Sequence, residues 1–463
     1  MAQVVGIDSS TQSTKVALYD ADDGHLITMG TAPHPDGTSV AIEAWAEALD
    51  AAGMGILDRS AAISVGGQQH GMVLLDGDGQ PVHDALLWND TRSAPDALTL
   101  IDELGGAQEW ATAVGSVPVA SFTVTKLRWV ARHAPDAAAK ASAVLLPHDW
   151  LTWNLTGRLS AAVTDRGDAS GTGYWSPAGG EYRMDLLSAA FGRELAVPRV
   201  LAPAEAAGET SWGAVVAPGT GDNMGAALGL GLGPGDAVVS IGTSGTVFAV
   251  SQGATADASG TVAGYADATG RFLPLVCTLN AARVLSATAA MLGVSLAELD
   301  ALALSAPAGA GGLTFLPYLD GERTPNLPDA TGSLLGMTRA NMTPANIARA
   351  AVEGLLCGLA DGMDAMRAQG VPIARAFLVG GGAKSAAVQQ LSADIFGVPV
   401  VIPAAEEYVA RGAARQAAWV LRGAAAPPEW PLTLVATHEP SGQLSSVRPS
   451  YAESRAAWVP RRG

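Results

Sequence analysis

The chain begins with two short apolar segments that are separated by a polar turn. Residues 3–8 and 15–20 carry Val, Ile, Ala and Leu, whereas residues 9–14 are all Ser, Thr or Gln. This pattern predicts a β-hairpin with a hydroxyl-rich turn. The apolar run 26–30 predicts a third strand that extends the hairpin.

Helical and strand patterns alternate after this hairpin. Apolar residues at helical spacing predict a helix over 42–57, and the apolar run 62–65 predicts a buried strand. Residues 125–133 predict another helix, which must end before Pro135. Such alternation is typical of an α/β protein.

The middle of the chain repeats the pattern of its beginning. Residues 225–235 are dense in glycine and indicate a domain boundary, so we expect domains at 1–233 and 234–463. Residues 237–250 then read as strand, hydroxyl-glycine turn and strand, like the N-terminal hairpin. This repetition predicts two related halves.

A third glycine turn lies in the second half. An apolar strand runs into three glycines within 377–385, and a helix is expected from about residue 385 to 396. Residues 397–402 predict another strand. The pattern weakens after Trp430, and residues 455–463 are expected to form a surface tail.

The charge balance excludes some classes of partner. The 463 residues include 27 Lys and Arg against 44 Asp and Glu, a net charge of −17. Nucleic-acid binding needs a basic face, and anionic membranes attract basic segments, so neither partner is expected. Two cysteines, Cys277 and Cys357, fit a reduced cytoplasmic interior.

The sequence also argues against a membrane segment. The N-terminus lacks the basic region of a signal peptide. Residues 301–319 carry no charge, but Pro and Gly interrupt them, so they predict a loop and a buried strand rather than a spanning helix.

Three glycine or hydroxyl turns between strands suit the binding of a nucleotide triphosphate. Backbone N–H groups must approach phosphate closely, and side chains would block them. None of the turns is a Walker A loop, because Ala383 stands where that motif has glycine before Lys384. Any one of these turns taken alone is more often an ordinary tight connection.

Two aspartates have ambiguous local settings. Asp8 ends a strand beside the hydroxyl turn, where it could hold Mg²⁺ through water or simply be solvated. Asp222 and Asn223 follow a glycine-bearing loop. They could cap the helix expected through 224–230, or they could place a carboxylate in a cleft.

Three polar-aromatic clusters contain side chains that can bind a sugar. They are 68–71, 88–92 and 148–150. Amide, imidazole and carboxylate groups can bind sugar hydroxyls, and Trp can cover an apolar sugar face. A lone histidine such as His70 is more often a core histidine with its hydrogen bonds satisfied, and the 7 histidines show no metal-binding spacing.

Several longer motifs occur in one order along nearly the whole chain. They are Gly6-Ile7-Asp8 with Thr11, Ser13 and Lys15; Gln68–Gly71; Leu87–Arg92; Ser121–Val130; Leu146–Asp149; Gly221–Asn223; Ser240–Gly245; Phe315–Pro325; Gly332–Glu353; and Gly380–Ser385. This ordered series resembles the FGGY family of carbohydrate kinases, and within it the members that phosphorylate D-xylulose.

The resemblance implies a fold, an activity and a set of site residues. The implied fold is α/β, a two-domain actin-like ATPase (ribonuclease H-like) fold with catalysis in the interdomain cleft. The implied activity is ATP- and Mg²⁺-dependent phosphorylation of D-xylulose to D-xylulose 5-phosphate, and a homodimer is plausible.

Asp222 corresponds to the catalytic base, and Asp8 to the acid linked to Mg²⁺ and activity; both would hold Mg²⁺ through water. The implied sugar-binding residues are Gln69, His70, Trp88, Asp149, Asp222 and Asn223. The implied ATP-binding residues are Thr11, Ser13, Lys15, Gly242, Thr243, Gly381, Gly382 and Ala383.

Two residues depart from the family pattern. Ser10 stands where many members have glycine, and serine tolerates fewer backbone angles. Gln69 stands where the xylulose-phosphorylating members often have methionine. A sibling kinase for ribulose, gluconate or glycerol therefore stays open, as does, more distantly, an actin- or chaperone-like ATPase that binds no sugar.

Overall fold

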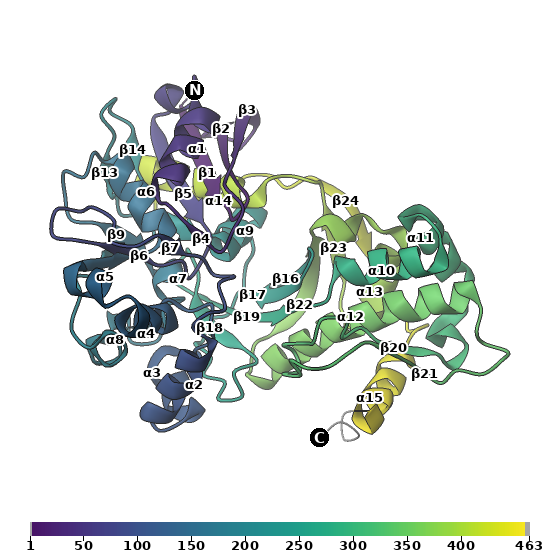
Figure 1. Cartoon of the computed structure of the whole chain (residues 1–463). Helices are drawn as coiled ribbons and strands as arrows, with labels where there is room; N and C mark the ends of the chain where they lie inside the picture. The colour runs from purple at the N-terminus through teal and green to yellow at the C-terminus, as the bar shows by residue number, and fades with distance from the viewer. Residues whose placement is uncertain (1, 459–463) are drawn as a thin grey trace. The chain divides into compact units, whose positions relative to one another are not determined.

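The computed structural model describes residues 2–458, which form two compact units (Figure 1). Unit 1 contains the chain up to Leu232, together with Gln252–Leu273 and Glu406–Leu432. Unit 2 contains Gly233–Ser251, Pro274–Ala405 and the chain from Thr433 onward. The predicted division at 233/234 stays a prediction, and the units interleave along the sequence.

The main sheet of unit 1 begins with the predicted hairpin and its third strand. The order is β13-β14-β5-β1-β2-β3, with β15 also pairing with β5. The strands are β1 (Gln3–Ser9), β2 (Ser13–Asp20), β3 (Leu26–Pro33), β5 (Ala62–Gly67), β13 (Gly208–Glu209), β14 (Val215–Val216) and β15 (Thr220–Gly221). The three N-terminal strands are antiparallel, whereas β5 and β14 continue the sheet in parallel.

The main sheet of unit 2 contains the order β19-β17-β16-β22-β23-β24. These strands are β16 (Gly235–Ile241), β17 (Gly245–Ala249), β19 (Phe272–Thr278), β22 (Ile373–Val379), β23 (Val400–Pro403) and β24 (Leu434–His438). The first three are antiparallel, and β22 and β23 continue the sheet in parallel. Strand for strand, this repeats unit 1, so the predicted internal duplication is confirmed.

The remaining strands form short pairs. They are β4 (Ser39–Val40) with β7 (Ala85–Leu86), β6 (Val73–Leu75) with β8 (Ala143–Leu145), β9 (Val163–Asp165) with β12 (Arg199–Leu201), β10 (Trp175–Ser176) with β11 (Glu181–Tyr182), and β20 (Thr314–Leu316) with β21 (Ser333–Leu335). Strand β18 (Ala263–Ala266) belongs to unit 1.

Helices cover the sheets in both units. Those of unit 1 are α1 (Glu43–Gly53), α2 (Ala94–Glu103), α3 (Ala107–Val114), α4 (Thr123–His133), α5 (Pro135–Lys140), α6 (Pro147–Leu155), α7 (Arg166–Ala169), α8 (Met184–Phe191), α9 (Asp222–Leu230), α14 (Tyr408–Arg422) and the 3₁₀ turn η1 (Leu57–Arg59). Those of unit 2 are α10 (Ala282–Leu292), α11 (Leu296–Ser305), α12 (Pro344–Ala368), α13 (Ala386–Phe396), α15 (Val447–Trp458) and the 3₁₀ turns η2 (Ala308–Gly312) and η3 (Gly381–Lys384).

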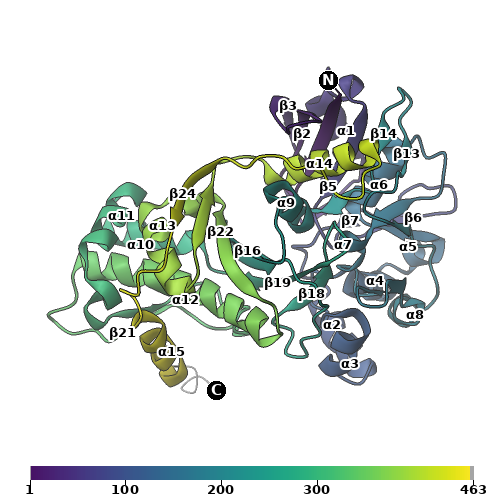
Figure 2. The same cartoon turned by 180° about the vertical axis from the view of Figure 1, so that it is seen from behind.

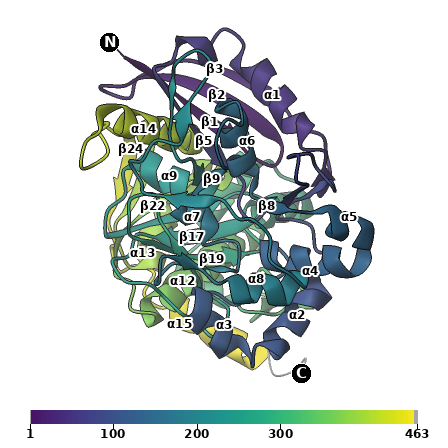
Figure 3. The same cartoon turned by 90° about the vertical axis from the view of Figure 1, so that its left-hand side faces the viewer.

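Alternation along β1 builds a core on each face of its sheet. Val5 and Ile7 pack in the cluster that contains Trp45 of α1, whereas Val4 packs in the cluster that contains Ala410 of α14. Figure 3 shows α1 and α14 on opposite sides of this sheet. Because side chains alternate between faces, Asp8 belongs to the α14 face.

Two glycines of the stretch 225–235, Gly225 and Gly229, serve close packing between helices. Residues 225–230 continue α9, which lies against α14 (Figure 2). A Cβ on Gly412 would lie 1.8 Å from the Gly225 carbonyl oxygen, and a Cβ on Gly229 would lie 2.1 Å from that of Tyr408. The expected helix through 224–230 is therefore confirmed, and its glycines allow two backbones to approach each other closely.

Two other expected elements have different bounds. The helix expected over 42–57 ends at Gly53, because Gly55 takes a left-handed φ of +69°. The stretch 301–319 is expected to be a loop and a strand. Its first residues instead complete α11, and the expected strand is β20. The signal for α11 lies upstream, in a capping box between Ser295 and Glu298.

The C-terminal segment contains a helix that its weak apolar pattern does not predict. Residues 455–458 belong to α15 rather than to a surface tail, and the rest of that expected tail, 459–463, lies outside the described residues. Arg448 and Arg455 of α15 both form ion pairs with Asp361 of α12. Charge pairing therefore anchors a helix that hydrophobic periodicity does not reveal.

Within residues 2–458, no single helix is long and apolar enough to cross a membrane. Only α10 and α11 taken together reach that length and apolar composition, and the chain bends by 88° between them.

Candidate active site

The buried carboxylate of Asp8 lies at the end of β1. Asp8 is 5% exposed, and its register partner on β2 is Lys15. The Lys15 ammonium lies 3.7 Å from Asp8 Oδ2 and donates a hydrogen bond of 2.6 Å to Glu407 Oε2. Burial raises the pKa of Asp8 to about 6, against the opposing charge of Lys15. Oδ1 has no hydrogen-bond partner among the described residues, so it is available to a cation or water.

The hydroxyl turn accommodates the serine that departs from the family pattern. The backbone N–H and the hydroxyl of Ser10 both donate to the Ser13 carbonyl, each at 3.0 Å. The non-glycine residues with positive φ in the described chain are His70, Arg158 and Ala310, so Ser10 needs no glycine-like angle. Thr11 in this turn accepts a hydrogen bond of 2.8 Å from the indole of Trp88.

Asp222 is the first residue of α9, and Gly221 rather than Asp222 is the N-cap. The capping interpretation is therefore wrong by one position, although the acid does lie in the first turn. Its Oδ1 accepts hydrogen bonds from the backbone N–H of Asn223 at 2.7 Å and from Asn223 Nδ2 at 2.8 Å. Burial, with the charge of Asp8 adding, raises the pKa of Asp222 to about 7 although Asn223 opposes it.

Gln69 follows β5 and joins the same group of side chains. Its Oε1 accepts a hydrogen bond of 3.0 Å from Asn223 Nδ2. Its Nε2 is buried and has no hydrogen-bond partner among the described residues. A buried donor left without a partner costs about 1–3 kcal/mol, which favours a ligand or water at this position. The structure thus brings Gln69, Asp222 and Asn223 together.

His70 takes an unusual backbone conformation beside Gln69. Its φ of +68° is uncommon for a residue with a side chain. Nδ1 donates to the Gly171 carbonyl at 2.6 Å, and Nε2 lies 3.3 Å from the hydroxyl of Tyr265. The ring stacks on Phe122 with centroids 4.8 Å apart. Because strained residues concentrate at functional sites, this geometry agrees with a binding role.

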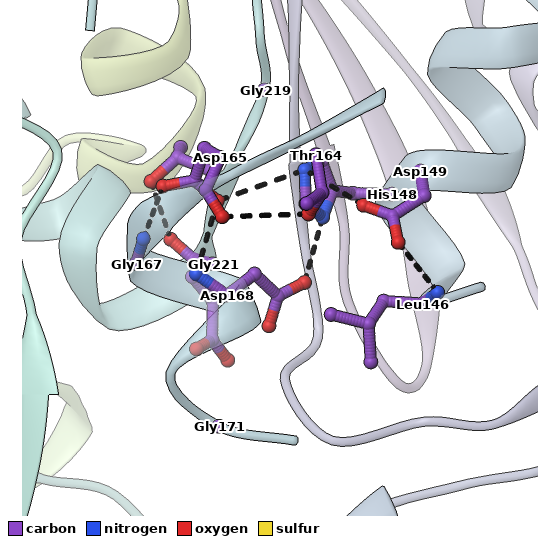
Figure 4. A network of polar contacts seen from close by, with 12 residues as sticks. Leu146, His148, Asp149, Thr164, Asp165, Gly167, Asp168, Gly171, Gly219 and Gly221 are labelled. Carbon is purple, nitrogen blue, oxygen red and sulfur yellow. Dashed lines mark hydrogen bonds and ion pairs between the residues drawn. The ribbon is translucent and has the colours of Figure 1, made fainter. Parts of the chain in front are cut away.

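Asp149 lies in a buried network together with His148 (Figure 4). Its Oδ2 accepts a hydrogen bond of 2.7 Å from the Leu146 N–H, and its Oδ1 lies 3.4 Å from His148 Nε2. His148 Nδ1 lies 2.6 Å from Asp168 Oδ2. Burial alone would lower the pKa of His148, but the charges of the facing aspartates outweigh burial, and the pKa is raised. Sugar binding by Asp149, which is 1% exposed, stays a prediction.

In unit 2, the second and third turns lie beside one pocket. Gly242 and Thr243 form the turn between β16 and β17, and Gly381–Ala383 lie in η3. A cavity of about 520 Å³ is lined by Thr243, Gly381, Gly382, Arg283, Leu296, Asp300 and Ser385, among others. A Cβ on Gly382 would lie 2.3 Å from Ile241 Cγ2, whereas nothing lies within 4 Å of one on Gly381. The turn is thus packed on one side and open on the other.

The donor set around Asp8 and Asp222 suits a hard cation held mainly by other ligands. No cluster of three or more His, Cys, Asp or Glu residues with metal-binding geometry occurs within residues 2–458. Mg²⁺ keeps several waters and binds through one or two carboxylates plus phosphate oxygens. The unpartnered Asp8 Oδ1 and the nearby Asp222 carboxylate match that chemistry.

Several residues of the site had no local signal in the sequence. Tyr265 and Glu407 enter unit 1 from distant parts of the chain, and Arg283 and Asp300 line the pocket of unit 2 from α10 and α11. Phe122 lies in the motif Ser121–Val130, but nothing in that motif indicates that its ring stacks on His70. Their identification requires the tertiary fold.

Two family models cover most of the chain. The N-terminal domain model of the FGGY family of carbohydrate kinases matches residues 3–229, and its C-terminal domain model matches residues 237–421.

Relatives and solved structures agree with these matches. The chain is 48% identical over 437 residues to a protein named xylulose kinase from Streptomyces coelicolor, covering 91% of this chain and 88% of the relative. It is 47% identical to a xylulose kinase from Streptomyces rubiginosus, with the same coverage. A crystal structure of xylulose kinase from Bifidobacterium adolescentis superposes with a TM-score of 0.93 at 46% identity, covering 98% of this chain and 99% of that one.

The matched domains, the duplicated sheets and this superposition establish the predicted α/β two-domain actin-like ATPase fold. The chain belongs to the FGGY family of carbohydrate kinases.

Proposed function

We propose that this protein phosphorylates D-xylulose at the expense of ATP and yields D-xylulose 5-phosphate and ADP. The observation that carries the proposal is the group formed by Asp222, Asn223 and Gln69, in which a carboxylate of raised pKa lies beside an unpartnered buried amide. The names of relatives at 47–48% identity support the choice of xylulose.

The sugar would be held by side chains of unit 1. Gln69 Nε2 and Asn223 can bind hydroxyls, and His70 presents a ring that its contacts with Gly171 and Phe122 fix in place. Trp88 is 43% exposed and can cover an apolar sugar face. Asp149 is also retained in this proposed set. These contacts would hold the sugar so that its C5 hydroxyl faces Asp222.

Asp222 would act as the general base. It accepts the proton of the C5 hydroxyl while that oxygen forms a bond to the γ-phosphorus of ATP. The bond between this phosphorus and the β,γ-bridging oxygen breaks, and ADP leaves with that electron pair. Because burial raises the pKa of Asp222, its carboxylate is a stronger base than an exposed aspartate and is better able to accept the proton.

ATP would contact turns of both units, and Mg²⁺ would accompany it. The proposed ATP contacts are Thr11, Ser13, Lys15, Gly242, Thr243, Gly381, Gly382 and Ala383. Asp8 and Asp222 would hold Mg²⁺ through water, and this ion supplies charge neutralisation for the transferring phosphoryl group. The placement of catalysis in an interdomain cleft, and a homodimer, are parts of the same proposal.

The proposal is tested by ATP consumption with a panel of substrates. Purified protein with Mg²⁺ is assayed against D-xylulose, D-ribulose, L-ribulose, D-gluconate, glycerol and xylitol. We expect kcat/KM for D-xylulose to exceed every other value at least tenfold. Preference for another substrate would reject xylulose and assign Gln69 to a different sugar. Turnover that no substrate stimulates would contradict sugar phosphorylation altogether.

A further inference from the structure

A buried histidine and two buried aspartates, His148, Asp165 and Asp168, lie outside the proposed catalytic, sugar-binding and ATP-binding residues. His148 is 0% exposed, and Asp165 and Asp168 are 3% and 0% exposed. Buried charges are costly unless they are paired. Because His148 and Asp168 are inaccessible, neither can touch a sugar or a nucleotide directly. Any effect of these residues on the reaction must pass through their neighbours.

One connection runs from His148 to Asp222. A Cβ on Gly219 would lie 2.2 Å from His148 Cδ2, so the imidazole packs directly on the backbone of Gly219 (Figure 4). The Gly219 carbonyl accepts a hydrogen bond of 2.9 Å from Gln416, and the next two residues pair with β5 as β15. Gly219 is three residues before Asp222, so the ring supports the segment that presents the carboxylate.

A second connection runs from His148 to His70. His148 Nδ1 donates to Asp168 Oδ2 at 2.6 Å, and Asp168 lies in the single-turn helix α7. The carbonyl of Asp168 accepts a hydrogen bond of 2.9 Å from the N–H of Gly171. The carbonyl of Gly171 in turn accepts from His70 Nδ1 at 2.6 Å. An unbroken series of hydrogen bonds therefore reaches the predicted sugar-binding ring.

Charge explains why a histidine suits this position. Its ring faces Asp149, Asp165 and Asp168, at distances of 3.4, 3.7 and 2.6 Å. Asp165 also caps α7 by accepting hydrogen bonds from the N–H groups of Gly167 and Asp168. Without a cation, these carboxylates would repel one another and displace α7. An imidazolium balances them and still fits against Gly219.

We propose that His148 is a positioning residue that sets Asp222 through Gly219 and His70 through Asp168 and Gly171. This inference rests on the proposed function, in which Asp222 is the base and His70 contacts the sugar. It goes beyond that function by assigning two separable tasks to one buried ring: the first governs turnover, and the second governs affinity for the sugar.

Two variants separate these tasks. His148→Asn places an amide donor near the position of Nδ1, so it can keep the bond to Asp168 but removes the ring from Gly219. We expect kcat to fall about 10- to 100-fold, while KM for the sugar changes less than about threefold. Asp168→Ala removes the second connection, and we expect KM for the sugar to rise about tenfold. Asp168→Asn keeps an acceptor and should return KM to within about threefold of the wild type.

Leu49→Ala is the matched control for lost stability, because Leu49 is buried in α1 within the core of the same unit and takes no part in either connection. It should lower Tm and leave kcat and KM within about twofold. If both cluster variants behave in this way, the positioning role is overturned. If His148→Asn does not fold, His148→Ser, which also removes the ring from Gly219, is judged by the fall in kcat. If Asp168→Ala does not fold, Asp168→Leu, which also removes the acceptor, is judged by the rise in KM.

The test is independent of the identity of the sugar. The variants are assayed with whichever panel substrate the wild type phosphorylates fastest, so preference for another sugar rejects the proposed function without touching this inference. A crystal structure of a His148 variant, superposed on unit 1 of the wild type, supplies a readout without activity. A displaced Asp222 carboxylate supports the inference, and an unmoved one overturns it.

Discussion

Lys15 and Glu407 are 392 residues apart in the sequence, yet the Lys15 ammonium donates a hydrogen bond of 2.6 Å to Glu407 Oε2. The same ammonium lies 3.7 Å from Asp8 Oδ2. Glu407 therefore competes with Asp8 for one cation. This competition keeps Lys15 from neutralising the carboxylate proposed to hold Mg²⁺.

Glu407→Gln should raise the Mg²⁺ concentration needed for half-maximal activity. Without the Glu407 charge, Lys15 moves toward Asp8 and opposes a second cation there. A partly exposed ion pair is worth about 1 kcal/mol, so we expect about a fivefold rise in a Mg²⁺ titration of activity. Glu205→Gln, which breaks the exposed pair with Arg199, is the control and should change nothing. An unchanged Mg²⁺ requirement in Glu407→Gln would refute this account.

Asp222→Asn should abolish most of the turnover and leave the fold intact. Asparagine cannot accept the hydroxyl proton, and loss of a general base costs about 10²–10⁴-fold in kcat. The variant also loses the repulsion between Asp222 and Asp8, so Tm should not fall. The checks are steady-state kinetics and thermal unfolding. Retention of more than about a tenth of wild-type kcat would remove Asp222 from the base role.

Gly381→Ala should weaken ATP binding without affecting stability. Nothing lies within 4 Å of a Cβ on Gly381, so alanine fits the protein, but the methyl group would block close approach of a nucleotide. We expect KM for ATP to rise about fivefold or more, with Tm unchanged. Gly253→Ala is the control, since a Cβ there also meets open space. Equal KM values in both variants would place the nucleotide elsewhere.

Lys126 should make stability increase with pH. Its Nζ is buried and donates to the carbonyl of Ala120 at 2.8 Å and also to that of Ser121. Burial lowers the pKa of Lys126 to about 7, with Asp90 opposing. The unfolded chain, with an ordinary lysine pKa near 10.5, then binds more protons between about pH 7 and pH 10.5. Stability therefore rises with pH across this window, by at most about 1.4 kcal/mol per pH unit.

The measurement is the free energy of urea unfolding at pH 7.5 and pH 9, compared with Lys126→Met. Other titrating groups contribute equally to both proteins, so the difference in slope isolates Lys126. A smaller rise in the wild type than in Lys126→Met would contradict the lowered pKa.

Local patterns predicted the elements that hold the site but not its assembly. The hairpin that pairs Asp8 with Lys15 follows from alternation and a polar turn. The turns at Gly242 and Gly381 follow from glycine between strand-like runs. The hydrogen bond from Asn223 to Gln69 spans 154 residues, and it depends on how α9 meets the end of β5. Sequence spacing carries no information on such a contact.

The sequence also did not predict which polar side chains of the site are buried. His148 and Asp149 have the composition of a binding cluster, but both are buried, and tertiary packing encloses His148 between Gly67 and Gly219. Tyr265 reaches His70 because Gln252–Leu273 belong to unit 1 although they follow the first strands of unit 2. Segments that leave one unit and re-enter it produce contacts without a local signature.

The position of α14 also has a consequence for synthesis on the ribosome. A Cβ on Gly6 would lie 1.8 Å from the Ala410 carbonyl, so the first strand is fitted to a helix that is translated more than 400 residues later in the chain. At about 5–20 residues per second, one face of the nascent sheet waits about 20 seconds or more for its cover. Unit 1 is thus completed only near the end of translation, and a ribosome-bound N-terminal half should remain a client for chaperones throughout that interval.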